Sequence, residues 1–215
     1  MNSSLRVNEI FLSIQGEGTR AGTPCVIIRL TGCNLRCSWC DTQYAWDQGQ
    51  QMSIDQVLAR VESLACKLVA VSGGEPLLQP AAPQLLRRLC EAGYTTLLET
   101  NGSLDISPVD PCVVKIVDFK CPASGQHENN HWANLGRLTQ DDEVKFVIAD
   151  REDYDFARQS VAARKIAGLC TVIFAPVHGR LDPAVLAEWI LADGLDVRIS
   201  LQLHRIIWPD RDRGV

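Results

Sequence analysis

The sequence lacks any long run of hydrophobic residues. No stretch reaches the roughly 18 consecutive apolar residues that a membrane-spanning helix needs. The amino-terminal segment, MNSSLRVNEIF, also lacks the continuous apolar core of a secretory signal. We therefore expect a cytoplasmic protein with no membrane partner.

The sequence has no excess of positive charge. Lys and Arg together number 21 against 26 Asp and Glu, so the formal net charge is −5. Nucleic acids are bound through clustered Lys and Arg, and this balance argues against a nucleic-acid partner. A small-molecule substrate fits better. The sequence also has no internal repeat, low-complexity tract or linker, and its 215 residues are expected to form one domain over 1–215.

A disulfide framework is also absent from the cysteine pattern. The nine cysteines are odd in number and, outside one cluster, irregularly spaced. Reduced thiols and metal ligation are therefore the better interpretation. Six cysteines have no chemistry assigned and are expected to pack as small hydrophobic side chains: Cys25, Cys66, Cys90, Cys112, Cys121 and Cys170.

The sequence does contain a regular alternation of strand and helix patterns. Strands are expected at 23–30, 67–76, 94–102, 113–122, 142–150, 170–179 and 196–204. Helices are expected at 53–64, 82–93, 151–166 and 182–192. This order predicts a parallel sheet with right-handed crossovers, and therefore an α/β barrel or open α/β layer. The polar segment 122–140 is predicted to be a long loop that acts as a lid or mobile segment.

Five polar motifs each follow an apolar strand. They are GCNLRCSWCDT, SGGEP, ETNG, DFKCP and APVHG, which begin at residues 32, 72, 99, 118 and 175. Functional sites of parallel α/β folds lie at the carboxyl ends of the strands. The five motifs are therefore predicted to converge on one face of the protein.

The first of these motifs contains three closely spaced cysteines. Cys33, Cys37 and Cys40 form a C-x3-C-x2-C set, and such soft thiolate ligands suit an iron–sulfur cluster or zinc. A structural zinc site normally has four protein ligands, and the nearest further cysteine, Cys25, lies inside a predicted strand. The spacing favours a cluster. A zinc-stabilised binding module and a chance grouping of buried cysteines remain the alternatives.

Together with the GGEP motif, the cysteine loop resembles the radical S-adenosylmethionine (SAM) superfamily. The resemblance implies a single-domain partial or modified (β/α) barrel. It also implies a [4Fe–4S] cluster on the three cysteines, whose fourth iron binds the amino and carboxylate groups of SAM. Glu75 and the backbone around it would receive the SAM ammonium, and Trp39, Ala175 and Pro176 would lie near the adenine. The SAM-binding residues implied in this way are Trp39, Ser72, Gly73, Gly74, Glu75, Glu99, Asn101, Asp118, Lys120 and Pro176.

Other motifs narrow the resemblance. SIQGEG at 13–18, CDTQYAW at 40–46, DFKCPASG at 118–125 and QLHRIIW at 202–208 are similar to the 7-carboxy-7-deazaguanine synthase family of queuosine biosynthesis. The resemblance implies ring contraction of 6-carboxy-5,6,7,8-tetrahydropterin with loss of ammonia. It further implies Mg²⁺ on Thr42, a homodimer, and an external electron donor such as flavodoxin. The pterin-binding residues implied are Gln15, Gly16, Glu17, Arg29, Gly74 and His204.

Simpler interpretations exist for several of these residues. Gln15 and Glu17 are also compatible with a polar turn, Arg29 with a surface salt bridge, and His204 with a structural histidine on a strand. Asp118 and Lys120 can belong to the SAM site or to a structural ion pair. A radical SAM activase that makes a glycyl radical on a partner protein shares the cysteine loop and the GGEP motif.

Overall fold

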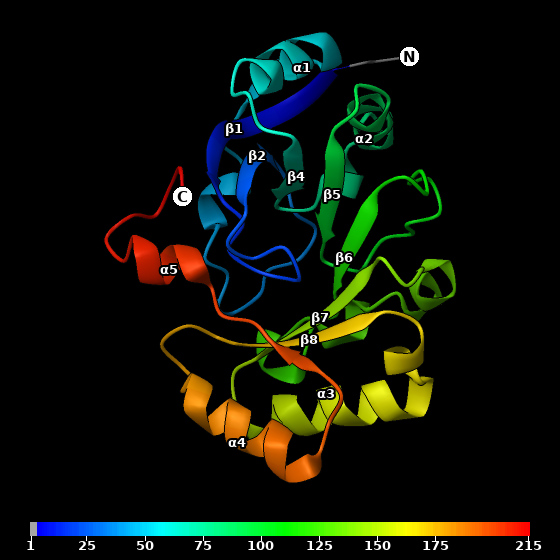
Figure 1. Cartoon of the computed structure of the whole chain (residues 1–215), viewed down its shortest axis with the longest axis vertical. Helices are drawn as coiled ribbons and strands as arrows, with labels where there is room; N and C mark the ends of the chain where they lie inside the picture. The colour runs from blue at the N-terminus through cyan, green and yellow to red at the C-terminus, as the bar shows by residue number, and fades with distance from the viewer. Residues whose placement is uncertain (1–3) are drawn as a thin grey trace.

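The protein is described by a computed structural model covering residues 4–215, in which nine strands form one sheet (Figure 1). The strand order is β3-β1-β2-β4-β5-β6-β7-β8-β9. The strands are β1 (Ser4–Ile14), β2 (Pro24–Leu30), β3 (Gln50–Ser53), β4 (Leu68–Gly73), β5 (Thr95–Thr100), β6 (Val114–Asp118), β7 (Glu143–Ile148), β8 (Thr171–Pro176) and β9 (Arg198–Ile199).

The sheet is mostly parallel and open. All neighbouring strands from β2 to β9 run parallel, whereas β1 is antiparallel to both β2 and β3. The edge strands β3 and β9 do not pair with one another, so the sheet curves without closing. The predicted α/β fold of the partial-barrel type is thereby confirmed. The sequence patterns did not identify β1 or β3.

Five α-helices accompany the sheet, and four of them are the predicted ones. They are α1 (Ile54–Glu62), α2 (Ala82–Glu91), α3 (Arg151–Arg164), α4 (Pro183–Asp193) and α5 (Leu203–Ile207). Helix α1 begins at a capping box in which the Ser53 hydroxyl accepts from the Gln56 N–H and the Gln56 side chain accepts from the Ser53 N–H. The fifth helix corrects a prediction, because 196–204 is strand only at Arg198–Ile199 and then turns into α5.

Six short 3-10 helices fill the connections. They are η1 (Gln43–Ala45), η2 (Pro76–Leu78), η3 (Pro122–Ser124), η4 (His127–Asn129), η5 (Trp132–Arg137) and η6 (Ile166–Gly168). Three of them lie in the segment 122–140 that was predicted to be a lid. That segment packs on the sheet: the Trp132 ring stacks on Phe119 with centroids 4.5 Å apart, and the Asn134 amide donates to the Leu104 carbonyl at 2.8 Å.

Alternate residues of the strands face opposite sides of the sheet. Val26, Ile28 and Leu30 of β2 belong to the main core, which also contains buried residues of α1 to α4. Ile27 and Arg29 point to the other side and line a cavity there. This period of two is expected of any strand. The helices therefore cover one face of the curved sheet, and the opposite, inner face is available for a site.

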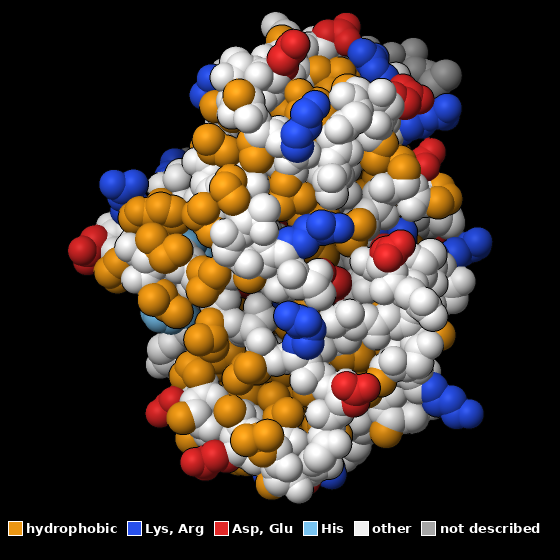
Figure 2. Space-filling view, in the orientation of Figure 1, with side chains coloured by type: hydrophobic (Ala, Val, Ile, Leu, Met, Phe, Trp, Pro, Cys, Tyr) orange, Lys and Arg blue, Asp and Glu red, His pale blue; other side chains and the backbone are white. Residues whose placement is uncertain are grey.

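The surface has one region rich in apolar side chains. Figure 2 shows hydrophobic side chains gathered on the side of the molecule where Figure 1 labels α4 and α5. Leu191 of α4 and Ile206 and Ile207 of α5 are exposed large hydrophobic residues. None of the helices within 4–215 combines the length and hydropathy needed to cross a membrane.

Candidate functional site

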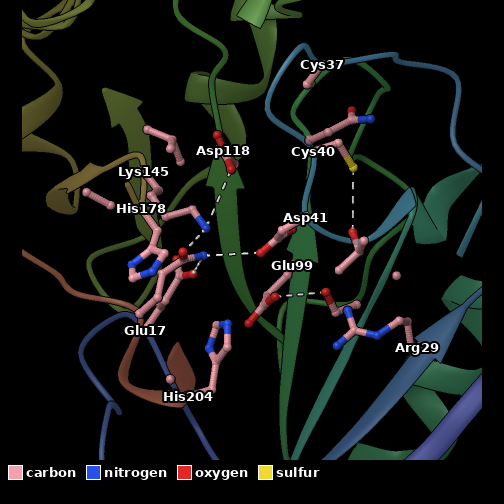
Figure 3. Close-up of a pocket in the computed structure, with 18 of the residues that line it drawn as sticks. Glu17, Arg29, Cys37, Cys40, Asp41, Glu99, Asp118, Lys145, His178 and His204 are labelled. Atoms are coloured by element: carbon pink, nitrogen blue, oxygen red, sulfur yellow. Dashed lines mark hydrogen bonds and ion pairs between the residues drawn. The ribbon is translucent and has the colours of Figure 1, made fainter. Parts of the chain in front are cut away.

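A cavity opens on the inner face of the sheet, and part of it is drawn in Figure 3. Its wall combines inner-face positions of the strands, the loops at their carboxyl ends and α5. All but one of the site residues proposed from the sequence line it: Gln15, Gly16, Glu17, Arg29, Cys33, Cys37, Trp39, Cys40, Thr42, Ser72, Gly73, Gly74, Glu99, Asn101, Asp118, Lys120, Pro176 and His204. The structure thus brings together residues from at least seven segments of the chain.

The three cysteines of the loop after β2 face this cavity as free thiols. Burial raises the pKa of the Cys37 thiol to about 11, although the nearby Lys120 ammonium acts in the opposite direction. Burial also raises the pKa of Cys33. Coordination to a metal would convert these thiols into thiolates, because a bound metal deprotonates the thiol that coordinates it.

The three cysteines of the loop offer thiolate ligands of the soft kind that iron–sulfur clusters and zinc both take. Across residues 4–215, no group of three His, Cys, Asp or Glu side chains is arranged as a metal site. The donor set of three soft thiolates beside a cavity fits an iron–sulfur cluster.

Gly73 packs against the end of β2, where a Cβ atom would lie 2.2 Å from the Leu30 carbonyl oxygen, and Gly74 packs against the start of the cysteine loop. A Cβ atom on Gly74 would lie 2.1 Å from the Gly32 carbonyl oxygen and 2.8 Å from the Cys33 Cβ. The Gly74 N–H donates to the Leu30 carbonyl at 3.2 Å, so the two backbones run side by side. The sequence predicts that these two glycines let the backbone approach a ligand closely. The structure shows that Gly74 also admits the start of the cysteine loop.

Glu75 is the predicted site residue that the structure does not place on the cavity wall. Its side chain is fully buried and accepts hydrogen bonds from the Thr100 hydroxyl at 2.9 Å and from the backbone N–H groups of Asn101 and Leu77 at 2.7 and 3.0 Å. Burial raises the pKa of this carboxyl against those hydrogen bonds. Glu75 ties the end of β4 to the end of β5, and Ser72, Gly73 and Gly74 are the residues of this motif that line the cavity.

Asn101 and Glu99 bind other side chains of the site. The Asn101 amide donates to Asn34 Oδ1 at 3.1 Å and lies 3.8 Å from Cys33 Sγ, so it supports the cysteine loop. The Glu99 carboxylate accepts from the Gln15 amide at 2.9 Å and from the Ser72 hydroxyl at 2.8 Å. Glu99 therefore links the segment after β1 to the end of β4.

The segment after β1 meets α5 at the cavity. The Leu203 N–H donates to the Gly16 carbonyl at 3.1 Å, and a Cβ on Gly16 would lie 2.7 Å from His204 Nδ1. His204 therefore lies on a short helix against Gly16 rather than on a strand. Burial lowers the pKa of His204, although the Glu17 and Asp41 carboxylates act in the opposite direction. The imidazole is accordingly neutral near pH 7.

Arg29 is a buried member of the wall rather than a surface residue. Its Nε lies 2.7 Å from Glu9 Oε1, and the Tyr44 hydroxyl donates to the same oxygen at 3.0 Å. Although burial acts to lower it, the neighbouring Tyr44 and Glu9 hold the pKa of the Arg29 guanidinium above its ordinary value. Because Glu9 holds Nε, the terminal nitrogens of the guanidinium remain able to donate hydrogen bonds to a carboxylate ligand.

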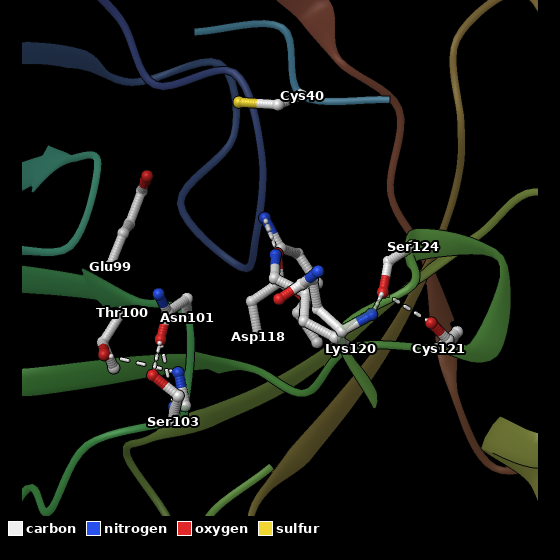
Figure 4. Close-up of polar contacts among 12 residues, drawn as sticks. Cys40, Glu99, Thr100, Asn101, Ser103, Asp118, Lys120, Cys121 and Ser124 are labelled. Atoms are coloured by element: carbon white, nitrogen blue, oxygen red, sulfur yellow. Dashed lines mark hydrogen bonds and ion pairs between the residues drawn. The ribbon is translucent and has the colours of Figure 1, made fainter. Parts of the chain in front are cut away.

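Two lysines of the cavity share one carboxylate (Figures 3 and 4). Asp118 Oδ2 lies 3.0 Å from Lys120 Nζ and 3.5 Å from Lys145 Nζ. The Lys120 ammonium also lies 5.2 Å from the centre of the Trp39 ring. Sequence reasoning missed Lys145 because it lies within the apolar strand β7. Its place at alternate positions with Val147, another cavity residue, is the signal that strand periodicity offered.

Further residues missing from the sequence prediction come from the carboxyl-terminal segment. Gln202, Arg205, Arg211, Asp212 and Val215 all line the cavity. Gln202 Nε2 donates to Glu17 Oε1 at 2.9 Å and lies 3.4 Å from Asp41 Oδ2. The sequence of this carboxyl-terminal segment, QLHRIIWPDRDRGV, has no periodicity that predicts which of its side chains line the cavity.

Two buried polar atoms of the wall have no partner among the described residues. Trp39 Nε1 is a hydrogen-bond donor and Asp118 Oδ1 is an acceptor, and both are shielded from solvent. Buried polar groups of native proteins are nearly always hydrogen-bonded. Each of these two atoms is therefore a candidate for a hydrogen bond to a bound ligand. One donor and one acceptor beside three thiols suit a polar cofactor bound next to a cluster.

Comparison with known proteins gives a consistent result. The family model of the radical SAM superfamily matches residues 27–116. A 7-carboxy-7-deazaguanine synthase of Koribacter versatilis is 44% identical over 98% of this chain and 100% of its own length. The enzyme of that name from Chlorobaculum tepidum is 46% identical over 98% of this chain and 97% of its own length.

Among solved structures, QueE from Escherichia coli superposes with a TM-score of 0.76 over 93% of this chain and 94% of that chain. The two sequences are 22% identical, so this match shows the fold alone. Streptococcus suis SuiB, bound to its precursor peptide, matches with a TM-score of 0.59 over 81% of this chain and 47% of its own. At 12% identity, this second match also shows the fold alone.

Proposed function

Because this chain belongs to the 7-carboxy-7-deazaguanine synthase family of radical SAM enzymes, we propose that it converts 6-carboxy-5,6,7,8-tetrahydropterin into 7-carboxy-7-deazaguanine with loss of ammonia. One observation carries the proposal: a single cavity joins the three cysteines to Glu17, Arg29 and His204. An activase of a partner protein has no need of such a set of buried polar groups.

The cofactors of this family are a [4Fe–4S] cluster and SAM, and the cavity has groups to hold both. Cys33, Cys37 and Cys40 would bind three irons. The unpartnered Trp39 Nε1 would donate a hydrogen bond to SAM or substrate, and the unpartnered Asp118 Oδ1 would accept one. When bound, the reduced cluster and SAM would supply the radical chemistry of the reaction at the pterin. The chain itself supplies orientation and a site shielded from water.

The opposite wall suits a carboxylated pterin. Each Glu17 oxygen already accepts one hydrogen bond, from Gln202 or Lys145, and keeps a lone pair for a ring N–H. Gln15 is buried beside it and completes the polar edge. Arg29 and the neutral His204 would hold the substrate carboxylate through charge-assisted and ordinary hydrogen bonds.

Thr42 is proposed as the protein ligand of Mg²⁺. It lines the cavity two residues after Cys40, and its hydroxyl lies 3.8 Å from Cys40 Sγ. Mg²⁺ keeps several waters and takes few protein ligands, so one hydroxyl and the substrate carboxylate are sufficient partners. The ion would neutralise that carboxylate and orient it during ring contraction.

The wider setting is proposed from the family resemblance. The protein would work in the cytoplasm as a homodimer and take electrons from a donor such as flavodoxin. Its nine free cysteines suit a reducing compartment. The exposed apolar side chains of α4 and α5 provide a surface for a second copy.

The test is turnover by anaerobically reconstituted protein supplied with SAM, Mg²⁺, a reductant and 6-carboxytetrahydropterin. We expect about four irons per chain and formation of 7-carboxy-7-deazaguanine. Ala at Cys33, Cys37 or Cys40 should abolish both, because each change removes one thiolate ligand. Cys66→Ala is the matched control, since Cys66 does not line the cavity and bonds the Pro24 carbonyl instead. An intact cluster in any of the three variants would count heavily against the assignment.

A further inference from the structure

Lys145 is a largely but not fully buried lysine, and its ammonium contacts two carboxylates. It lies on the inner face of β7 and lines the cavity. Its Nζ is 2.8 Å from Glu17 Oε2 and 3.5 Å from Asp118 Oδ2 (Figure 3). Burial of an ammonium group costs free energy unless a negative charge pairs with it. The two carboxylates therefore stabilise Lys145 at this position.

The contacts form a neutral group of four side chains. Two carboxylates, Glu17 and Asp118, alternate with two ammonium groups, Lys145 and Lys120 (Figure 4 shows the Asp118 and Lys120 end). Their side chains are 18%, 14%, 13% and 9% exposed, respectively. Screening by water is therefore weak, and removal of one member leaves an uncompensated buried charge.

Lys145 controls the charge state of Glu17. Burial by itself raises the pKa of Glu17, but the Lys145 ammonium and the hydrogen bonds from Lys145 and Gln202 bring it below its ordinary value. The other titratable groups near this pair come from four elements: Asp118 of β6, Glu99 of β5, Asp41 of the cysteine loop, and His204 and Arg205 of α5. Lys145 is the cation that touches Glu17 directly.

We propose that Lys145 is a positioning residue for the pterin: it holds the Glu17 carboxylate in the one orientation in which both oxygens accept N–H groups of the ring. This inference rests on the proposed function. Lys145 fixes Oε2 and Gln202 fixes Oε1, so the carboxylate is held at both oxygens and retains one lone pair on each. A protonated Glu17 would present an O–H donor to ring N–H donors, which is a mismatch.

The main experiment compares Lys145→Met with the unchanged protein, using the KM for the pterin across pH. Loss of Lys145 leaves one excess negative charge in the buried group, which protonation of Glu17 relieves. We expect KM to rise at least about tenfold near pH 6, and the effect to shrink near pH 8.5 as Glu17 ionises again. The kcat should change less than KM. Lys145→Arg, which keeps the charge, should recover most of the affinity.

A matched control is available in the neighbouring strand. Lys115 of β6 is also buried and lies 3.1 Å from Asp142 Oδ1, but it does not line the cavity. Lys115→Met should lower stability while leaving KM and its pH profile unchanged. Equal effects of Lys115→Met and Lys145→Met on KM would overturn the inference, because they would reflect a general loss of structure.

A double variant tests whether Lys145 acts through Glu17 even if Lys145→Met alone fails to fold. Glu17→Gln with Lys145→Met removes both charges of the pair and should bind 6-carboxypterin, a fluorescent analogue, as well as Glu17→Gln alone does. Weaker binding by the double variant would show that Lys145 acts independently of Glu17. A Lys145→Met protein with normal KM at every pH would also overturn the inference.

Failure of this inference is distinguishable from failure of the proposed function. If the unchanged protein makes no 7-carboxy-7-deazaguanine, the proposed function fails. If it makes the product and Lys145→Met does so with an unaltered KM, only the role of Lys145 fails. Iron content should be unchanged in all Lys145 variants, because the contacts that the described residues give Lys145 are with Glu17 and Asp118 rather than with the three cysteines.

Discussion

Thr42 and Glu17 line the same cavity, but their side chains are expected to have different roles. Thr42 belongs to the cysteine loop, whereas Glu17 follows β1 and is held by Lys145 and Gln202. A metal ligand acts on the reacting end of the substrate, where charge is neutralised and oriented. A carboxylate that accepts ring N–H groups acts on binding. Replacement of each residue should therefore change a different kinetic constant.

Thr42→Ala should lower turnover at least about tenfold and weaken its response to added Mg²⁺, because the ion loses its protein ligand. Product formation against Mg²⁺ concentration measures this. The iron content serves as the control and should remain at the level of the unchanged protein. Turnover with the ordinary Mg²⁺ response would remove Thr42 from the metal site.

Glu17→Gln should chiefly raise KM for the pterin, by roughly 10- to 100-fold, since a hydrogen bond to a charged group contributes about 1.5–3 kcal/mol. The measurement is initial rate against pterin concentration at saturating Mg²⁺. The cluster should again survive. Unchanged kinetics in both this variant and Thr42→Ala would leave the radical SAM assignment standing and would contradict the pterin reaction.

Among the elements, the turn after β4 and the cysteine loop depend on one another. The turn passes so close to Gly32 and Cys33 that a side chain at residue 74 has no room. The neighbouring Glu75 then holds the ends of β4 and β5 together from a fully buried position. The GGEP motif thus shapes the cysteine loop through backbone packing.

Gly74→Ala should destabilise the fold by about 1–3 kcal/mol and reduce iron retention, because the new methyl group meets backbone atoms rather than a flexible side chain. Gly136→Ala is the matched control, since a Cβ there meets nothing within 4 Å. Thermal unfolding and iron content of the two reconstituted variants are the measurements. Similar behaviour of both would show that the cysteine loop can shift without cost.

In the segment that contains helix α5, tertiary contacts outweigh the strand-like pattern of the sequence. The run DVRISLQLH alternates as a strand does, but β9 pairs with β8 only at Arg198 and Ile199. The following chain is held by the segment after β1, where Leu203 donates to Gly16 and the Ser200 hydroxyl accepts from the Gly18 N–H. Those contacts join residues nearly two hundred positions apart, which no local pattern reports.

At the scale of the whole molecule, the open sheet leaves its inner face accessible from one side. The cavity occupies that face, and α5 with the carboxyl-terminal segment forms part of its wall. On the outside, the exposed Leu191, Ile206 and Ile207 lie on α4 and α5. Apolar side chains gathered in this way are typical of an interface between protein chains.

We expect the protein to form a homodimer. Sedimentation at micromolar concentration should show a species of twice 23.7 kDa. Leu191→Asp, which places a charge at an exposed position outside the cavity, should weaken the dimer if α4 lies in the interface. A species of 23.7 kDa alone in the unchanged protein would reject the dimer.

Much of the fold and of the site was determined by local sequence features. Apolar runs and helical periodicity identified the parallel strands β2 and β4 to β8 and the helices α1 to α4, because these patterns follow from burial of one face of each element. The spacing of Cys33, Cys37 and Cys40, and the polar motifs at strand ends, indicated the site because parallel strands bring their carboxyl ends to one edge.

Only the tertiary structure decided the contacts between distant segments. It buried Glu75 behind the ends of two strands, turned residues 203–207 into a helix, and brought Lys145 to Glu17 across 128 positions of sequence. Lys145 lies in an apolar strand, and its sequence neighbours carry no sign of its partner. Charge pairing inside a protein depends on which side chains meet in space, and that is settled by the packing of the whole sheet.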